Sequence, residues 1–266
     1  MKKIILSALT VLMLIIACKT VPVTGRKQLH LLPESTLVSM SLDQYRQFLS
    51  ENQVVNNTAQ SQLVKRVGAN IAQATETYLR QNNEADMIEN LKWEFNLVQD
   101  EQANAWAMPG GKVVIYSGIL KYTQDEAGLA TVMSHEVAHA IAQHGNERMS
   151  QMLTAQLGGM ALDVALRNKP SETRNMFLTA YGLGAQVGVL LPFSRTQETE
   201  ADKIGLVFMA MAGYDPRESL NFWKRMEAGS SGGQPPEFLS THPSHQTRLD
   251  NLRKFMPTAL KYYKPK

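Results

Sequence analysis

The sequence contains a single cysteine, Cys18, among its 266 residues. One cysteine cannot form a disulfide within the chain, which excludes small folds stapled by disulfides. Aromatic residues make up only 7% of the chain and no run of Lys or Arg stands out, so nucleic acid is not expected as a partner. Internal repeats are also absent. With 44% hydrophobic and 19% charged residues, the composition is that of a globular chain able to bury a core in one domain.

An apolar stretch stands at the start of the chain. Lys2 and Lys3 precede the largely apolar residues 4–17. This stretch is too short to span a bilayer comfortably and has the length of the apolar region of a signal peptide. We therefore predict that residues 1–17 are a signal peptide for export.

The lone cysteine follows this stretch directly. The run Ile15-Ile16-Ala17-Cys18 resembles the bacterial lipobox, which implies that Cys18 is lipidated, begins the mature chain and attaches it to a membrane. An ordinary signal peptide that is cut near Cys18 is the alternative. Residues 18–33 contain Pro22, Gly25 and Pro33 and show little periodicity, so they are expected to form a tether.

Hydrophobic periodicity in residues 34–266 predicts one α+β domain that is mainly helical, with a small, largely antiparallel sheet. Helices are expected at 34–49 and 58–79, and strands at 93–98, 103–108 and 112–116. Pro109 and Gly110 between the last two strands have the chemistry of a type II turn.

The next segment predicts a buried helix. Thr123 and Glu126 are spaced as a capping box, and Gly145 is a stop signal, so the helix should run to about Gln143. Residues 127–142 are apolar on nearly every face, which is typical of a helix buried on all sides. The polar side chains inside such a helix need partners, because an unpaired buried polar group costs several kcal/mol.

Two of these polar residues are His135 and His139, one turn apart on one face. Together with Glu136 they form the sequence HExxH, in which two imidazoles bind one zinc ion and the glutamate is the general base. His144 lies near the end of the same helix, where capping the negative end of the helix dipole is favoured over ligation. Zinc is inferred from the types of ligand, and another divalent metal is the alternative.

A catalytic zinc ion usually takes a third protein ligand. Ser194 and Gln197 are spaced as another capping box, which predicts a helix that runs to about residue 212. Glu198 and Asp202 then lie on one face, with Glu198 as the ligand and Asp202 accepting a hydrogen bond from a ligand histidine, while Glu200 points elsewhere. An acidic helix start that only favours the dipole is the alternative reading.

The combination of His135-Glu136-Val-Ala-His139 with Glu198-Thr-Glu-Ala-Asp202 resembles the gluzincin peptidases of the HtpX and CaaX prenyl endopeptidase family. Supporting matches are Asn104-Ala-Trp-Ala-Met-Pro-Gly-Gly111, Ser194-Arg195 and Thr241-His242-Pro243 with Arg248. Residues 21–29 are similar to the start of the small bacterial lipoprotein members. The resemblance covers most of the chain from Val21 onward and implies a zincin-like fold with one zinc ion.

The resemblance also implies roles for residues outside the two helices. His242 is expected to approach the zinc ion as an additional ligand that holds the enzyme shut, or to act in catalysis. Arg248 could stabilise the developing oxyanion, although a surface arginine is nearly as compatible with the sequence. An edge strand above the zinc ion should pair with extended substrate. The residues expected there are Asn104, Gly110, Gly111, Lys112, Val113 and Val114, and an internal strand is the alternative.

Residues 176–193 form an uncharged run long enough to be a membrane-span candidate. Its polar residues, its glycines and Pro192 favour a buried helix or a lid instead. The loop from Gly229 to Pro236, which precedes His242, is expected to be mobile.

These features predict a zinc endopeptidase that degrades unfolded or misfolded proteins of the cell envelope. We expect it to be lipid-anchored at the outer membrane, facing the periplasm, since Lys19 rather than Asp follows the cysteine. An envelope protein is a possible partner. The alternative is a periplasmic chaperone or assembly factor with a latent or structural zinc site, although such a site has no need of Glu136.

Overall fold

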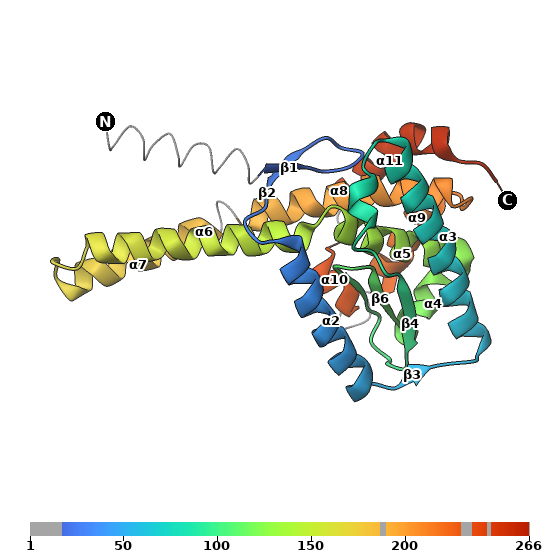
Figure 1. Cartoon of the computed structure of the whole chain (residues 1–266), viewed down its shortest axis with the longest axis horizontal. Helices are drawn as coiled ribbons and strands as arrows, with labels where there is room; N and C mark the ends of the chain where they lie inside the picture. Colours follow the sequence, from blue (N-terminus) through green and yellow to red (C-terminus); the bar gives the residue numbers. More distant parts are fainter. Residues whose placement is uncertain (1–17, 187–189, 230–235, 244–245, 266) are drawn as a thin grey trace.

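The computed structural model describes residues 18–186, 190–229, 236–243 and 246–265 (Figure 1). The strands are β1 (Cys18–Thr20), β2 (Lys27–Leu29), β3 (Val54–Val55), β4 (Glu94–Val98), β5 (Ala105–Met108) and β6 (Lys112–Tyr116). The α-helices are α2 (Glu34–Glu51), α3 (Ala59–Gln81), α4 (Leu120–Thr123), α5 (Glu126–Ile141), α6 (His144–Ala165), α7 (Ser171–Ala185), α8 (Leu191–Met211), α9 (Glu218–Gly229), α10 (Glu237–Thr241) and α11 (Gln246–Ala259). Short 3₁₀ helices are η1 (Ala85–Ile88), η2 (Ser117–Ile119) and η5 (Leu260–Tyr262).

This architecture confirms the predicted α+β fold that is mainly helical, and it confirms the helices and strands expected between residues 34 and 116. The predicted signal peptide and most of the loop predicted to be mobile lie outside the described residues. Within the described ranges, every helix is too short or too polar to cross a membrane.

A four-stranded sheet has the order β3-β4-β6-β5. Its pairs are antiparallel except β4 with β6, which run parallel, so the sheet is mixed rather than purely antiparallel. Side chains alternate between its faces, as strand geometry requires. Leu97 and Ile115 join the main core beneath α3 and α5, whereas Val114 packs in a second cluster with Tyr45 of α2. Both faces of the sheet are therefore covered.

Helix α5 lies at the centre of the core and is buried along almost its whole length, as its sequence predicts. It packs most extensively against α8. The two helices approach each other closely at Gly205 of α8, where a Cβ atom would lie 3.1 Å from the backbone nitrogen of His135. A glycine at this crossing brings the acidic face of α8 within reach of the histidines of α5.

Both predicted capping boxes are wrong. Thr123 is the last residue of α4, and Gln124, with φ of 65°, reverses the chain so that Asp125 becomes the N-cap of α5. The Asp125 side chain accepts a hydrogen bond from the backbone N–H of Gly128 at 2.8 Å. Helix α8 already begins at Leu191, which places Ser194 inside the helix.

The segment predicted to be a tether is folded onto the domain. Strands β1 and β2 form an antiparallel hairpin, and Val21 between them belongs to the main core. The Gln28 side chain is buried and donates a hydrogen bond to the carbonyl of Ala142 at 2.6 Å, just beyond the end of α5. The chain is thus fixed to the domain within ten residues of Cys18.

The prediction that residues 176–193 form a buried helix is wrong for the described residues of α7, and a role as a lid stays a prediction. Helices α6 and α7 form a long hairpin that projects away from the rest of the molecule (Figure 1). No side chain of α7 is buried, and the buried residues of α6 all lie in its first two turns or so, up to Gln151. The sequence signal was misleading because the apolar residues of this segment face outward instead of covering a core.

Candidate metal centre

The middle of α5 carries His135, Glu136 and His139, all three less than a tenth exposed. Helical spacing places His135 and His139 one turn apart, and their Nε2 atoms lie 3.1 Å apart. Glu136 is turned toward a different neighbour, since its Oε1 lies 3.3 Å from Nε2 of His242. The prediction that the two histidines share one face of a buried helix is confirmed by this geometry.

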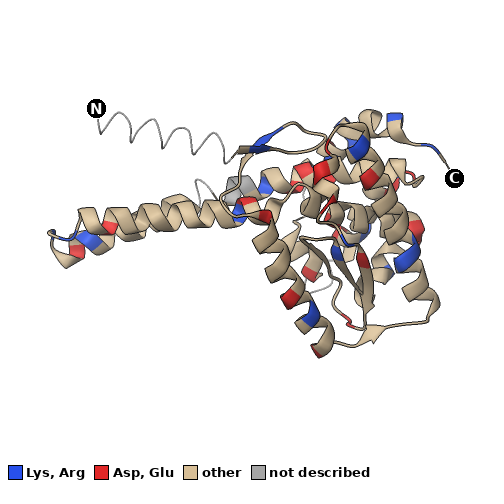
Figure 2. Cartoon of the chain, viewed as in Figure 1, with Lys and Arg blue, Asp and Glu red and all other residues tan. Residues whose placement is uncertain are grey.

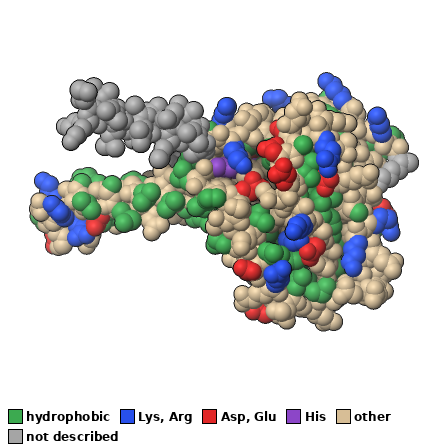
Figure 3. Space-filling view, viewed as in Figure 1, with side chains coloured by type: hydrophobic (Ala, Val, Ile, Leu, Met, Phe, Trp, Pro, Cys, Tyr) green, Lys and Arg blue, Asp and Glu red, His purple; other side chains and the backbone are tan. Residues whose placement is uncertain are grey.

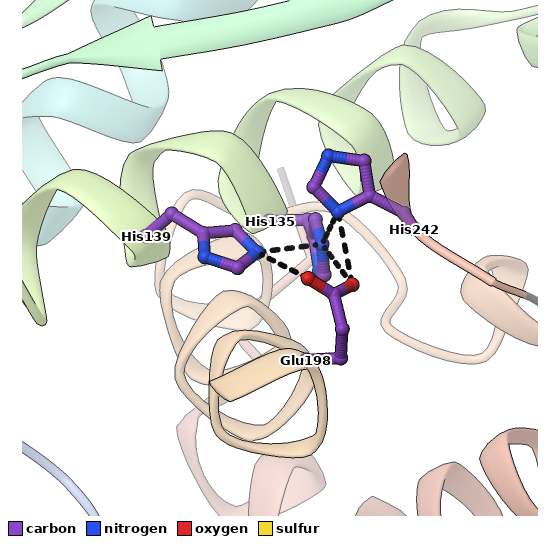
Figure 4. Close-up of side chains that lie close together, drawn as sticks. All are labelled: His135, His139, Glu198 and His242. Carbon is purple, nitrogen blue, oxygen red and sulfur yellow. Dashed lines mark hydrogen bonds and ion pairs between the residues drawn. The ribbon is translucent and has the colours of Figure 1, made fainter. Parts of the chain in front are cut away.

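Helix α8 supplies a carboxylate to the two histidines. Oε1 of Glu198 lies 3.2 Å from Nε2 of His139, and its Oε2 lies 3.3 Å from Nε2 of His135. His242, directly after α10, completes the group with its Nδ1 at 2.9 Å from Glu198 Oε2 and 3.1 Å from His135 Nε2 (Figure 4). Ligand atoms of all four residues lie within 4.8 Å of one another, so the structure brings every predicted metal ligand together.

This group fits a zinc ion. Ligand atoms bound tetrahedrally to zinc lie roughly 3.4 Å apart, close to the 2.9–3.3 Å that separates the ligand atoms of His135 and Glu198 from each other and from those of the other two residues. Three imidazoles and one carboxylate are also typical zinc donors. His135 directs its other nitrogen, Nδ1, at Asp202, so its Nε2 presents a lone pair to the group. Lone pairs that converge in this way from several sides are stabilised by a cation between them.

Glu136 differs from the four ligands because a buried oxygen of its carboxylate, Oε1, has no hydrogen-bond partner among the described residues. Burial raises the pKa of this carboxyl above its ordinary value. A carboxylate of raised pKa at the border of the metal group has the position and the basicity of a general base.

Comparison with known proteins decides the family. The family model described as "Peptidase family M48" matches residues 51–256, which includes α5, α8 and the segment of His242. The chain belongs to peptidase family M48. Zinc is the cofactor of this family, in agreement with the ligands present here.

The chain is also similar in sequence to individual peptidases from several organisms. It is 38% identical over 173 residues to the mitochondrial metalloendopeptidase OMA1 of Schizosaccharomyces pombe, covering 65% of this chain and 49% of the relative. It is 32% identical over 250 residues to the mitochondrial metalloendopeptidase OMA1 of Bos taurus, covering 90% of this chain and 46% of the relative. The beta-barrel assembly-enhancing protease of Escherichia coli is 31% identical over 163 residues, covering 60% of this chain and 33% of the relative. The matches thus cover half or less of each of these relatives.

Asp202 lies where the sequence predicted, on the outer side of His135. Its Oδ1 is 3.0 Å from Nδ1 of His135. Burial lowers the pKa of His135, but the hydrogen bonds to Asp202 and Glu198 outweigh it and raise this pKa to about 9. Such a carboxylate fixes the ring orientation and increases the basicity of the nitrogen that faces the metal.

Arg248 is buried, so the alternative of a surface arginine is wrong. Its Nη2 donates to Asp202 at 2.7 Å, its Nη1 lies 3.4 Å from Glu198 Oε2, and the guanidinium stacks 3.4 Å from the centre of the Trp223 ring. Nη1 also donates to the carbonyl of His242 at 3.2 Å. The side chain thus ties two acidic residues of α8 to the His242 segment, and its role at an oxyanion stays a prediction.

His139 has an outer partner that the sequence reasoning missed. His144, predicted to be a helix cap, is the first residue of α6 and is fully buried. Its Nδ1 lies 2.9 Å from Nδ1 of His139, and its Nε2 lies 3.0 Å from Oε2 of Glu200. Burial lowers the pKa of both rings, which favours neutral imidazoles. If His144 donates Nε2–H to Glu200, its Nδ1 accepts from His139 and leaves Nε2 of His139 free for zinc.

Glu200 in turn is held by the β1–β2 hairpin. Arg26 donates to Glu200 through Nη2 at 2.7 Å and to Glu147 through Nη1 at 2.6 Å. Burial opposes ionisation of Glu200, but hydrogen bonds from His144 and Arg26 lower its pKa to about 2. Arg26, Glu200 and His144 therefore form a chain of contacts that runs from the β1–β2 hairpin to a zinc ligand.

We expect Arg26→Met to weaken zinc binding about 10-fold, because outer partners of zinc ligands contribute about 10–100-fold to metal affinity. The methionine side chain fills part of the same volume but cannot donate hydrogen bonds to Glu200, so Glu200 is no longer fixed beside His144. Competition with a chromophoric chelator measures the zinc dissociation constant. Arg66→Met is the matched control, because Arg66 pairs with Glu126 at the surface, and it should bind zinc as the parent does. Equal affinities in the two variants would show that the contact chain does not support the metal.

The edge strand beside the metal group is β5, and the prediction that placed it at Lys112 to Val114 is wrong. Those residues belong to β6, which lies between β4 and β5 and is buried. Lys112 has a structural role, since its Nζ donates to Glu94 and to the carbonyl of Lys92. In the described part of the chain no strand pairs with the outer edge of β5.

The turn before β6 agrees with the sequence, since φ is 86° at Gly110 and 79° at Gly111. Asn104 stands directly before β5 and caps it by accepting a hydrogen bond from the backbone N–H of Ala105 at 2.9 Å. On the strand itself, the backbone of Ala107 is close enough to the Glu136 carboxylate to lower its pKa. The backbone of β5 thus approaches the Glu136 carboxylate, the predicted general base.

Proposed function

We propose that this chain is a zinc-dependent endopeptidase that hydrolyses peptide bonds in unfolded or misfolded proteins of the cell envelope. The observation that carries this proposal is the convergence of His135, His139 and Glu198 on one point with the Glu136 carboxylate beside it. A zinc site that is only structural has no use for a buried carboxylate at its border.

Each of these residues has a separate role in the proposed amide hydrolysis. When bound, zinc supplies Lewis acidity and lowers the pKa of water to about 7. Glu136 accepts the proton of the attacking water and delivers it to the leaving amine. Asp202 and His144 hold the two ligand histidines in orientation, and Arg248 holds Asp202 and Glu198.

The edge of β5 accounts for the proposed substrate class. An extended peptide that adds to this edge would form main-chain hydrogen bonds, which depend little on its sequence. The scissile bond would then pass beside Glu136, because the backbone of Ala107 already contacts that carboxylate. A folded protein presents few extended segments, so unfolded chains would be selected.

The proposed location rests on the sequence and on the name of one relative. The run that ends at Cys18 has the features of a lipobox, and we propose a lipid anchor there, at the outer membrane and facing the periplasm. The name of the Escherichia coli relative connects that protein with the assembly of beta-barrels. A partner among envelope proteins, and a place among the small lipoprotein members of the HtpX and CaaX prenyl endopeptidase group, are part of the proposal.

Removal of the metal tests the function. The full chain, purified in detergent with zinc, should cleave β-casein, which is an unfolded protein. After treatment with a chelator, cleavage should fall to the level of a blank, and added Zn²⁺ should restore it. Cleavage that survives removal of the metal, as measured by atomic absorption, would contradict a zinc peptidase.

A periplasmic chaperone or assembly factor is the second candidate, and His242 is the observation that favours it. Its Nδ1 lies among the zinc ligands, where it would occupy the position that a catalytic site leaves open. A chain that captures unfolded proteins at β5 while its metal site stays closed would suppress aggregation of an unfolded protein but release no fragments.

A further inference from the structure

The α6–α7 hairpin exposes an unusual amount of apolar surface. Ten large hydrophobic side chains of the described residues are strongly exposed, and seven of them lie on this hairpin. The seven are Met152, Leu157, Met160, Val164, Met176, Phe177 and Leu183. Figure 3 shows hydrophobic side chains along the length of the projecting hairpin. Apolar patches of this kind mark contact surfaces for proteins or membranes.

The hairpin has no core of its own. Its two helices are joined by a hydrogen bond of 2.9 Å from the Tyr181 hydroxyl to the carbonyl of Ala155, and by packing of the Tyr181 ring on Gly158. Arg174 and Asp163 form an ion pair near the tip. Two helices cannot cover each other on all sides, so a second apolar phase is needed to remove these side chains from water.

Charges are confined to the two ends of the hairpin. Residues 149–162 of α6 and residues 175–185 of α7 contain no Asp, Glu, Lys or Arg. The tip carries Asp163, Arg167, Lys169, Glu172 and Arg174, and Figure 2 shows these charges clustered at the far end. An uncharged stem can place its apolar side chains in the outer acyl region of a bilayer, while the charges at its two ends stay among the headgroups.

The base of the hairpin lies where the N-terminal apolar run joins the fold. Cys18 lines one apolar groove together with Leu29 of β2, Ala155 of α6, and Tyr181 and Ala185 of α7. Residues 4–17, the largely apolar run, end one residue before Cys18. This step rests on the membrane anchor proposed above: if that run stays in a membrane, or a lipid on Cys18 replaces it, the bilayer comes next to the hairpin.

We propose that the α6–α7 hairpin lies on the surface of a lipid bilayer, with its apolar side chains in the outer part of the acyl region. From Met152 to Val164 the helix advances only about 18 Å, short of the roughly 30 Å of a hydrocarbon core. An upright hairpin would also force the charges of its tip into hydrocarbon, at a cost of several kcal/mol. A flat hairpin leaves those charges among the headgroups and gives the domain a fixed orientation toward the membrane.

An environment-sensitive probe tests this contact in the full chain. Because Cys18 is the only cysteine, Met160→Cys and Phe177→Cys each add one new thiol for a nitrobenzoxadiazole label. Met40→Cys is the matched control, since Met40 is similarly exposed but lies on α2. Each labelled protein is reconstituted into vesicles of phosphatidylethanolamine and phosphatidylglycerol, and the signal of the labelled parent chain is subtracted.

We expect the emission of the hairpin probes to shift to the blue and to be quenched by nitroxide-labelled lipids, while the Met40 probe remains in water. Circular dichroism confirms that each variant is folded. If the emission of the probes on the hairpin stays at the wavelength seen in water, the proposal is overturned. A blue shift without quenching by the lipids also overturns it, because a protein surface, such as a second copy of this chain, would then cover the hairpin. Neither result bears on the peptidase activity.

Discussion

Replacement of Glu136 by Gln should abolish proteolysis and leave the zinc ion in place. Glutamine has nearly the same shape as glutamate but cannot accept the proton of the attacking water. General-base catalysis contributes about 10²–10⁴-fold in rate, so kcat/KM for an unfolded substrate should fall by about that factor. Glu136 is not among the grouped ligand residues, and the zinc content should therefore stay at one per chain.

Glu126→Gln is the matched control for this experiment. Glu126 begins the same helix, is partly exposed and pairs with Arg66 at the surface, so its replacement should leave cleavage unchanged. Fragment release is measured by gel electrophoresis and zinc by atomic absorption. A Glu136→Gln protein that still cleaves at the parental rate would falsify the role of general base. If the parent is inert although it holds zinc, the chaperone function gains support.

His242→Ala should raise basal proteolysis. The His242 ring lies against both Glu198 and His135, so it competes with water and substrate for the fourth position on the metal. A hydrogen bond to a charged group contributes about 1.5–3 kcal/mol, which corresponds to an activation of about 10-fold or more when this contact is lost. Initial rates of casein cleavage at saturating zinc measure the effect.

Ser240→Ala on the same short helix is the control, because Ser240 is exposed and does not belong to the group of metal ligands. The alternative role of His242 has a different outcome. If the ring assists the reaction through its contact with Glu136, His242→Ala lowers the rate instead of raising it. The zinc dissociation constant of the same variant shows separately how much the His242 ring contributes to holding the metal.

The metal ligands were predictable because most of their geometry is local. His135 and His139, and likewise Glu198 and Asp202, are four residues apart, and helical geometry alone places each pair on one face. The burial of α5 could be read from its continuous apolar composition. His242 lies in a segment with no periodic signal, and it was assigned only through the resemblance to a family.

The partners outside the ligand shell could not be read in the same way. His144 and Glu200 are 56 residues apart and meet only because α6 and α8 converge beside α5. Arg26 approaches the same site from the opposite end of the sequence, through a hairpin whose residues have no helical or strand-like period long enough to detect. Such pairs depend on tertiary packing and leave no short-range signal in one sequence.

The sequence by itself determined many local elements of this protein: the main helices and strands between residues 34 and 116, the buried helix α5, the turn at Pro109-Gly110, and the faces that carry His135, His139 and Glu198. Each of these follows from interactions between residues a few positions apart. Tertiary structure alone decided that β5 rather than β6 is the free edge, that residues 18–33 are docked, and that α6 and α7 project from the domain. The physical reason is that an apolar side chain is stabilised equally by a core, a membrane or a partner, so periodicity shows which face is apolar and not what covers it.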